Sequence, residues 1–182
     1  MDINDLQPIL EAIIYVAEDP AKPQQLKEIF PNESHETIES ALRKLMDDFN
    51  SRPGGMVIRE IAAGFRMTTR PEYHEHVRAY LKTKPGARLS MAALETLAVI
   101  AYRQPVTLAE ILAIRGKKSS TALQTLLEKK LVAIVGRKHV VGRPILYGTS
   151  REFLVHFGLK DLSELPTLAE FAELSGEQHS RT

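Results

Sequence analysis

Apolar side chains recur at helical spacing in three segments of the first half of the chain, and each segment predicts an amphipathic helix. The first helix would bury a face made of Leu6, Ile9, Leu10, Ile13, Ile14, Val16 and Ala17. Pro23 suits the first turn of a short second helix, which would turn inward Leu26, Ile29 and Phe30. Ser34 is a favourable N-cap for a third helix, which would bury Ile38, Ala41, Leu42, Leu45, Met46 and Phe49.

Two β-like runs, Met56–Ile61 and Phe65–Thr69, follow around a predicted turn at Ala63-Gly64, and Pro71 would open a helix through Leu81. The same order of elements then returns with an offset of about 80 residues. The second set comprises helices at 90–102, 108–114 and 119–130, strands at 132–136 and 145–149, and a tail helix at 151–157. Six elements in one order, found twice, indicate two copies of one small module.

Three helices followed by a hairpin are the layout of a winged helix, which is a helix-turn-helix with a hairpin appended. We therefore expect a mainly α fold with small β-hairpins (α+β), built from two tandem winged-helix domains. The predicted first domain covers residues 1–82, and a linker with Pro and Gly covers 83–89. The second domain would cover 90–160, and 161–182 would form an acidic, partly disordered tail.

Charge is unevenly distributed along the 182 residues, although the total is only +1. Residues 1–82 carry 10 basic and 14 acidic side chains, residues 83–160 carry 13 and 4, and residues 161–182 carry 1 and 5. The basic middle section indicates either an acidic partner or a solvated basic surface. The acidic N-terminus and the short apolar runs predict a cytoplasmic protein without a signal peptide or a membrane span.

No residue pattern points to catalysis, so we expect a non-enzymatic protein with no cofactor and no bound metal. The chain has no Cys, which excludes thiol catalysis and Cys-bound zinc. It also lacks a Gly-rich phosphate loop, an HExxH motif and a Gly-x-Ser-x-Gly elbow. His74 and His76 are two residues apart on a predicted helix, where they point about 200° apart and do not share a metal.

Basic residues surround the predicted second hairpin at Arg137, Lys138 and Arg143, and Lys117-Lys118 precede the third helix of that module. Such a hairpin can lie along a phosphate backbone or enter a minor groove. The third helix turns outward Thr121, Gln124, Thr125 and Glu128. Because none of these is basic, we expect at most weak, sequence-independent contact with DNA.

Exposed apolar positions give a second kind of candidate site, a protein-partner interface at Tyr15, Val99 and Tyr102. Tyr15 lies on the face opposite the core set of its helix, and Val99 occupies the corresponding face of the second module, near Tyr102. The alternative is that each residue is covered by its own hairpin or tail helix. The helix from Met91 to Tyr102 is apolar over more of its circumference than one core face needs.

The second half of the chain resembles the segregation and condensation protein B family over residues 93–166, and Leu10–Phe30 fits a looser N-terminal pattern. The blocks that carry the resemblance are Ala93–Thr107, Ile114–Gly116, Thr125–Glu128, Gly136-Arg137, Gly142–Thr149, Phe153–Leu159 and Leu162–Pro166. One departure is Lys117-Lys118, where the family more often has an apolar residue and an acid.

The resemblance implies a homodimeric, non-catalytic scaffold or regulatory subunit of the bacterial SMC–kleisin condensin, associated with the nucleoid. Such proteins bind the kleisin subunit, segregation and condensation protein A, and reach the SMC ATPase through it in chromosome condensation and segregation. The resemblance assigns a region and no list of contact residues. The alternative from another class is a winged-helix DNA-binding transcriptional regulator that uses the second hairpin.

Overall fold

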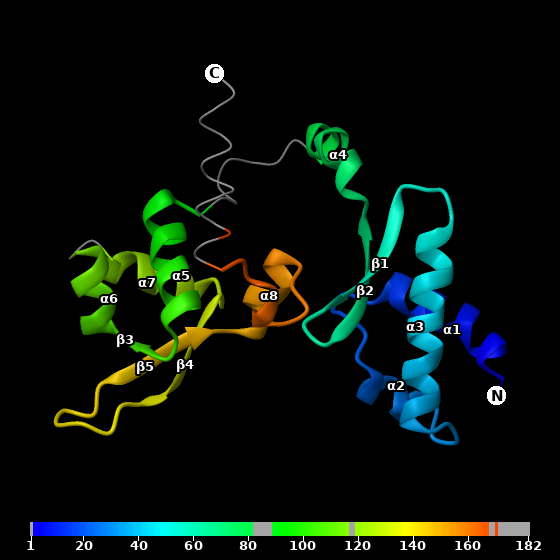
Figure 1. Cartoon of the computed structure of the whole chain (residues 1–182), viewed down its shortest axis with the longest axis horizontal. Helices are drawn as coiled ribbons and strands as arrows, with labels where there is room; N and C mark the ends of the chain where they lie inside the picture. Colours follow the sequence, from blue (N-terminus) through cyan, green and yellow to red (C-terminus); the bar gives the residue numbers. More distant parts are fainter. Residues whose placement is uncertain (1, 82–88, 117–118, 168–169, 171–182) are drawn as a thin grey trace. The chain divides into compact units, whose positions relative to one another are not determined.

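The chain folds into two compact units, residues 1–70 with 158–182 and residues 71–157. The computed structural model (Figure 1) describes residues 2–81, 89–116, 119–167 and 170. Within these residues it contains eight α-helices and two small antiparallel sheets. Most of the predicted linker and most of the predicted tail lie outside the described residues.

The first unit places three helices beside a two-stranded hairpin. Its elements are α1 (Ile3–Val16), α2 (Pro23–Ile29), α3 (His35–Ser51), β1 (Met56–Ile61) and β2 (Gly64–Thr69). Helix α3 contacts α1, α2 and β1, so it lies at the centre of the unit. The core is built from Leu6, Leu10, Ile14, Leu26, Ile38, Ala41, Leu42, Leu45, Ile58 and Phe65. This confirms the predicted order of elements and the predicted inner face of α3.

Some inward assignments are wrong. Ile9 and Val16 of α1 are exposed, because the neighbours of α1 bury only the narrow stripe of Leu6, Leu10 and Ile14, and Ile29 at the end of α2 is also exposed. The hairpin turn also lies one residue earlier than expected. Ile61 pairs with Gly64, and the two residues between them, Ala62 and Ala63, both have positive φ angles of 50° and 57°.

Polar side chains fix the ends of the elements in this unit. The Oγ of Ser34 accepts a hydrogen bond from the Thr37 backbone N–H and caps α3, as predicted. The amide of Asn50 bonds both backbone groups of Ile58, at 2.8 and 2.9 Å, and so links α3 to β1. The segment after residue 157 also belongs to this unit, since the Ala62 N–H donates to the Leu159 carbonyl.

The second unit repeats the order of three helices and a hairpin. Its elements are η1 (Pro71–Tyr73), α4 (His74–Leu81), α5 (Met91–Arg103), β3 (Val106–Thr107), α6 (Leu108–Arg115), α7 (Ser119–Glu128), β4 (Val132–Arg137), β5 (Ile145–Thr149) and α8 (Arg151–Phe157). The sheet order is β3-β5-β4, and the short β3 was not predicted. In Figure 1 the connection between β4 and β5 projects away from α5, α6 and α7.

The C-terminal end of α5 is tied to the sheet by Gln104. Its Oε1 accepts hydrogen bonds from the backbone N–H and the hydroxyl of Thr149 on β5, at 2.8 and 3.0 Å. Gly148 lies beside this contact, where an added Cβ would be 2.9 Å from both Gln104 Oε1 and Val135 Cγ1. A larger residue at position 148 would therefore force the side chain of Gln104 or Val135 to shift.

Candidate partner-binding surfaces

The outer face of α5 carries several apolar residues that are partly or largely exposed, beside the exposed Glu95. Its core face consists of Ala93, Thr96, Leu97 and Ile100. On the opposite side Met91 is 70% exposed, Leu94 38% and Tyr102 37%, and Ala98 between them is also exposed. These four residues are called the α5 stripe below. Val99, which the sequence also predicts as a partner residue, is half-buried at the border of the α5 stripe. Exposed apolar residues in a row on one helix mark a candidate protein interface.

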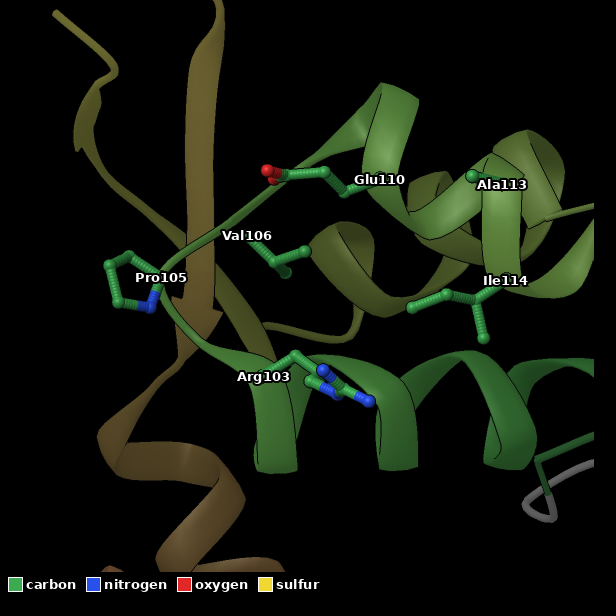
Figure 2. A pocket seen from close by; sticks show the side chains of 6 residues that line it. All are labelled: Arg103, Pro105, Val106, Glu110, Ala113 and Ile114. Carbon is green, nitrogen blue, oxygen red and sulfur yellow. The ribbon is translucent and has the colours of Figure 1, made fainter.

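A groove of about 330 Å³ lies beside α5, at its junction with α6. Figure 2 shows the side chains that line it, with Ile114 extending from α6 toward α5 and Arg103 on the α5 side. The lining residues are Arg103, Pro105, Val106, Glu110, Ala113 and Ile114. Sequence reasoning placed none of them in a site, because the groove forms only when the turn after α5 folds back along α6.

The two charged residues of this groove differ in how they are paired. Glu110 forms a capping box with Thr107, accepting hydrogen bonds from its backbone N–H and hydroxyl at 2.8 and 2.7 Å. The Lys138 ammonium donates to the other carboxylate oxygen at 2.6 Å. Lys138 first, and then Thr107, lower the pKa of Glu110 from 4.5 to about 2. Arg103 has no ion pair or hydrogen bond among the described side chains, so its charge is unbalanced.

Tyr15 lies at a separate surface in the first unit. Its side chain is 74% exposed and lines a groove of about 480 Å³ with Pro8, Glu11, Ala12, Phe49, Met56 and Met67. Two methionines and an aromatic ring give this groove an apolar wall, and methionine adapts easily to different partners. Tyr15 belongs to the first unit, whereas Val99 and Tyr102 belong to the second.

The basic hairpin of the second unit is partly neutralised. Lys138 is paired with Glu110, and the Arg137 guanidinium donates to the Arg143 carbonyl at 3.2 Å. Arg143 is exposed at the tip, beside Val141, which is fully exposed. Lys117 and Lys118 lie outside the described residues.

The third helix of this unit, α7, has few side-chain hydrogen-bonding groups left to contact the edge of a DNA base. The Gln124 amide donates to Glu128 at 3.2 Å, and the Thr125 hydroxyl donates to the Thr121 carbonyl. Within the described part of the chain, no three His, Cys, Asp or Glu side chains are grouped closely enough to hold a metal ion. No described helix is both long and apolar enough to span a membrane.

Several residues of the family-like blocks hold the fold rather than a ligand. Gln104, Gly148 and Thr149 join α5 to the sheet, and Thr107 with Glu110 begins α6. Arg115 forms an ion pair with Glu95 and so joins α6 to α5. These contacts give several residues of the blocks a structural role at the turn after α5.

Comparison with known proteins places this fold in a family. Residues 8–168 match the family model described as "Segregation and condensation complex subunit ScpB". The chain is 46% identical over 180 residues to segregation and condensation protein B of Syntrophotalea carbinolica, covering 99% of this chain and 90% of that one. It is 48% identical over 177 residues to the protein of that name from Myxococcus xanthus, covering 97% of this chain and 53% of the longer relative.

A solved structure, ScpB from Mycobacterium tuberculosis, is 34% identical and covers 87% of this chain and 98% of that chain, with a TM-score of 0.41. The family match and the curated relatives cover most of the sequence. The chain belongs to the ScpB family of segregation and condensation complex subunits. This confirms the family resemblance found in residues 93–166.

Proposed function

We propose that this chain is a non-catalytic scaffold and regulatory subunit of the bacterial SMC–kleisin condensin, acting in the cytoplasm at the nucleoid. In this proposal it binds the kleisin subunit directly and the SMC ATPase only through the kleisin. Each unit acts as a winged helix, the first for pairing with a second copy and the second for binding the partner. Family membership and the succession of three helices and a hairpin in each unit support this interpretation.

The observation that carries kleisin binding is the α5 stripe. A helix that packs on one side against α6, α7 and β5 needs apolar residues on that side only. The α5 stripe adds a second apolar face, on which Met91 is 70% exposed and Leu94 and Tyr102 each keep more than a third of their surface exposed. An extended partner segment that becomes ordered on binding would cover this face and remove its apolar surface from water.

Isothermal titration calorimetry of the full chain with the purified kleisin subunit tests the proposal. We expect the double variant Val99→Glu/Tyr102→Ala to bind at least about 10-fold more weakly than wild type, because one buried aromatic anchor is commonly worth about 2 kcal/mol. The matched control is Val141→Glu/Tyr80→Ala, which makes the same changes at exposed positions outside α5.

The control variant should bind like wild type, and circular dichroism should show that both variants are folded. Because Val99 is half-buried, Met91→Ser provides a second variant at a freely exposed position of the α5 stripe. Equal affinity of all folded variants would refute this surface. Absence of wild-type binding would refute the proposed function itself.

Contact with DNA is proposed only as weak and sequence-independent. Of the five basic residues considered, Lys138 is already paired within the unit, which reduces the charge available to phosphates. Family membership favours the condensin subunit over the alternative of a transcriptional regulator. A sequence-selective site with nanomolar affinity, measured by fluorescence anisotropy, would reverse this preference.

A further inference from the structure

The groove between the end of α5 and α6 combines an apolar lining with one unbalanced cation. Pro105, Val106, Ala113 and Ile114 form its apolar part, and Ile114 is exposed (Figure 2). Its volume of about 330 Å³ is at the small end of ligand pockets, which suits a single side chain better than a cofactor.

The charge of the groove is set by Arg103 alone. The Glu110 carboxylate accepts hydrogen bonds from Thr107 and Lys138 and stays ionised within that network. Lys138 cancels the charge of Glu110, whereas the Arg103 guanidinium has no partner among the described residues. A guanidinium presents several donors in a planar fork that matches a carboxylate.

We propose that this groove binds an apolar side chain of the kleisin that lies within one helical turn of an Asp or Glu, whose carboxylate pairs with Arg103. The inference rests on the proposed function and extends it by naming the chemistry of the bound segment. An acidic partner also matches the strongly basic section of the chain, residues 83–160, with 13 basic and 4 acidic side chains.

Calorimetry with the purified kleisin at low and high salt distinguishes the ion pair at Arg103 from the apolar contact in the groove. We expect Arg103→Gln to weaken binding about 10-fold at low salt, and the difference from wild type to shrink at high salt, because exposed ion pairs are screened. Ala113→Leu fills the groove and should weaken binding about 10-fold at every salt concentration, since it excludes the apolar side chain. Arg143→Gln, an exposed arginine of the same unit outside the groove, is the matched control.

The occupant is identified by replacing Ile114 with the photo-crosslinking residue p-benzoylphenylalanine in the full chain and irradiating it with the kleisin. Mass spectrometry should place the crosslink on a kleisin peptide with an apolar residue near an Asp or Glu. Crosslinks only to residues 168–182 of this chain, or none at all, would overturn the proposal. Wild-type affinity in both Arg103→Gln and Ala113→Leu would also overturn the groove proposal. The proposed function would still hold if the wild-type chain binds the kleisin.

Discussion

Individual residues in and around the turn after α5 hold this part of the fold together. Gln104 holds Thr149, Gly148 leaves room for that contact, and Thr107 caps α6. The capping box of Thr107 and Glu110 is readable in the sequence as a Thr followed three residues later by a Glu. The pairing of Glu110 with Lys138 joins residues 28 positions apart, so no local pattern predicts it.

Gly148→Ala should destabilise the protein by about 1–3 kcal/mol, the usual cost of overpacking. The added methyl would meet Gln104 Oε1 and Val135 Cγ1 at 2.9 Å and disturb the hydrogen bonds to Thr149. Urea unfolding measures the change. Gly54→Ala is the control, because nothing lies within 4 Å of its added Cβ, and it should be neutral or slightly stabilising. Equal effects of the two substitutions would contradict the packing argument.

The Glu110 carboxylate predicts a pH dependence of stability. Its pKa is about 2 in the folded chain, lowered from 4.5, so its contribution is fully present above pH 4.5 and is lost as the pH falls through about 2. Urea unfolding should show wild type more stable than Glu110→Gln at pH 7, with the difference disappearing near pH 2. When Lys138→Gln is introduced into both proteins, the stability difference between them at pH 7 should become smaller, since Lys138 is the largest cause of the lowered pKa of Glu110. A difference that does not change with pH would mean that Glu110 acts through packing alone.

At the level of helices and strands, the sequence predicts where most elements begin and end, but it predicts less well which of their residues are buried. Helix α8 begins and ends as predicted at Arg151 and Phe157, and α3 buries its predicted face. Ile9 and Val16 were placed inward because periodicity shows which residues share a face, whereas tertiary packing decides how wide the buried face is. The short strand β3 has only two residues and is defined by its pairing with β5, which leaves no pattern in the sequence.

The β4–β5 hairpin predicts a specific salt dependence of weak DNA binding. Contact by all five basic residues would give a log–log slope of roughly −4 to −5, and about −3.6 is expected if Lys138 stays paired with Glu110. Fluorescence anisotropy with a random duplex should show that Arg143→Gln reduces the slope by about 1, whereas Lys138→Gln leaves it unchanged. A larger effect of Lys138→Gln would show that DNA displaces Glu110 from this lysine.

At the scale of the whole molecule, the uneven charge and the two apolar surfaces suggest a division of tasks between the units. Tyr15 and its groove belong to the acidic first unit, and the α5 stripe belongs to the basic second unit. The sequence predicts Tyr15, Val99 and Tyr102 as partner residues from helical periodicity. It did not reveal the grooves beside them, because each groove is lined by residues from several elements.

We expect the full chain to be a homodimer that pairs through the Tyr15 surface, since a two-fold interface uses the same patch on both copies. Tyr15→Glu should shift the dimer toward monomer in multi-angle light scattering, because it places a charge in an apolar interface. Tyr80→Glu changes a tyrosine that is even more exposed, at 86%, and should leave the dimer intact. Loss of the dimer in Tyr80→Glu and its retention in Tyr15→Glu would move the interface to α4.

Methyl NMR of the full chain, titrated with the purified kleisin subunit, tests the central claim most directly. We expect the methyl signals of Met91 and Leu94 on the α5 stripe, and of Ile114 in the adjoining groove, to shift or broaden on binding. The signals of Ile134 and Val141 on the β4–β5 hairpin, which are more exposed than Leu94 and Ile114, should stay in place. Changes confined to the hairpin or to the first unit would contradict the assignment of kleisin binding to α5 and its groove.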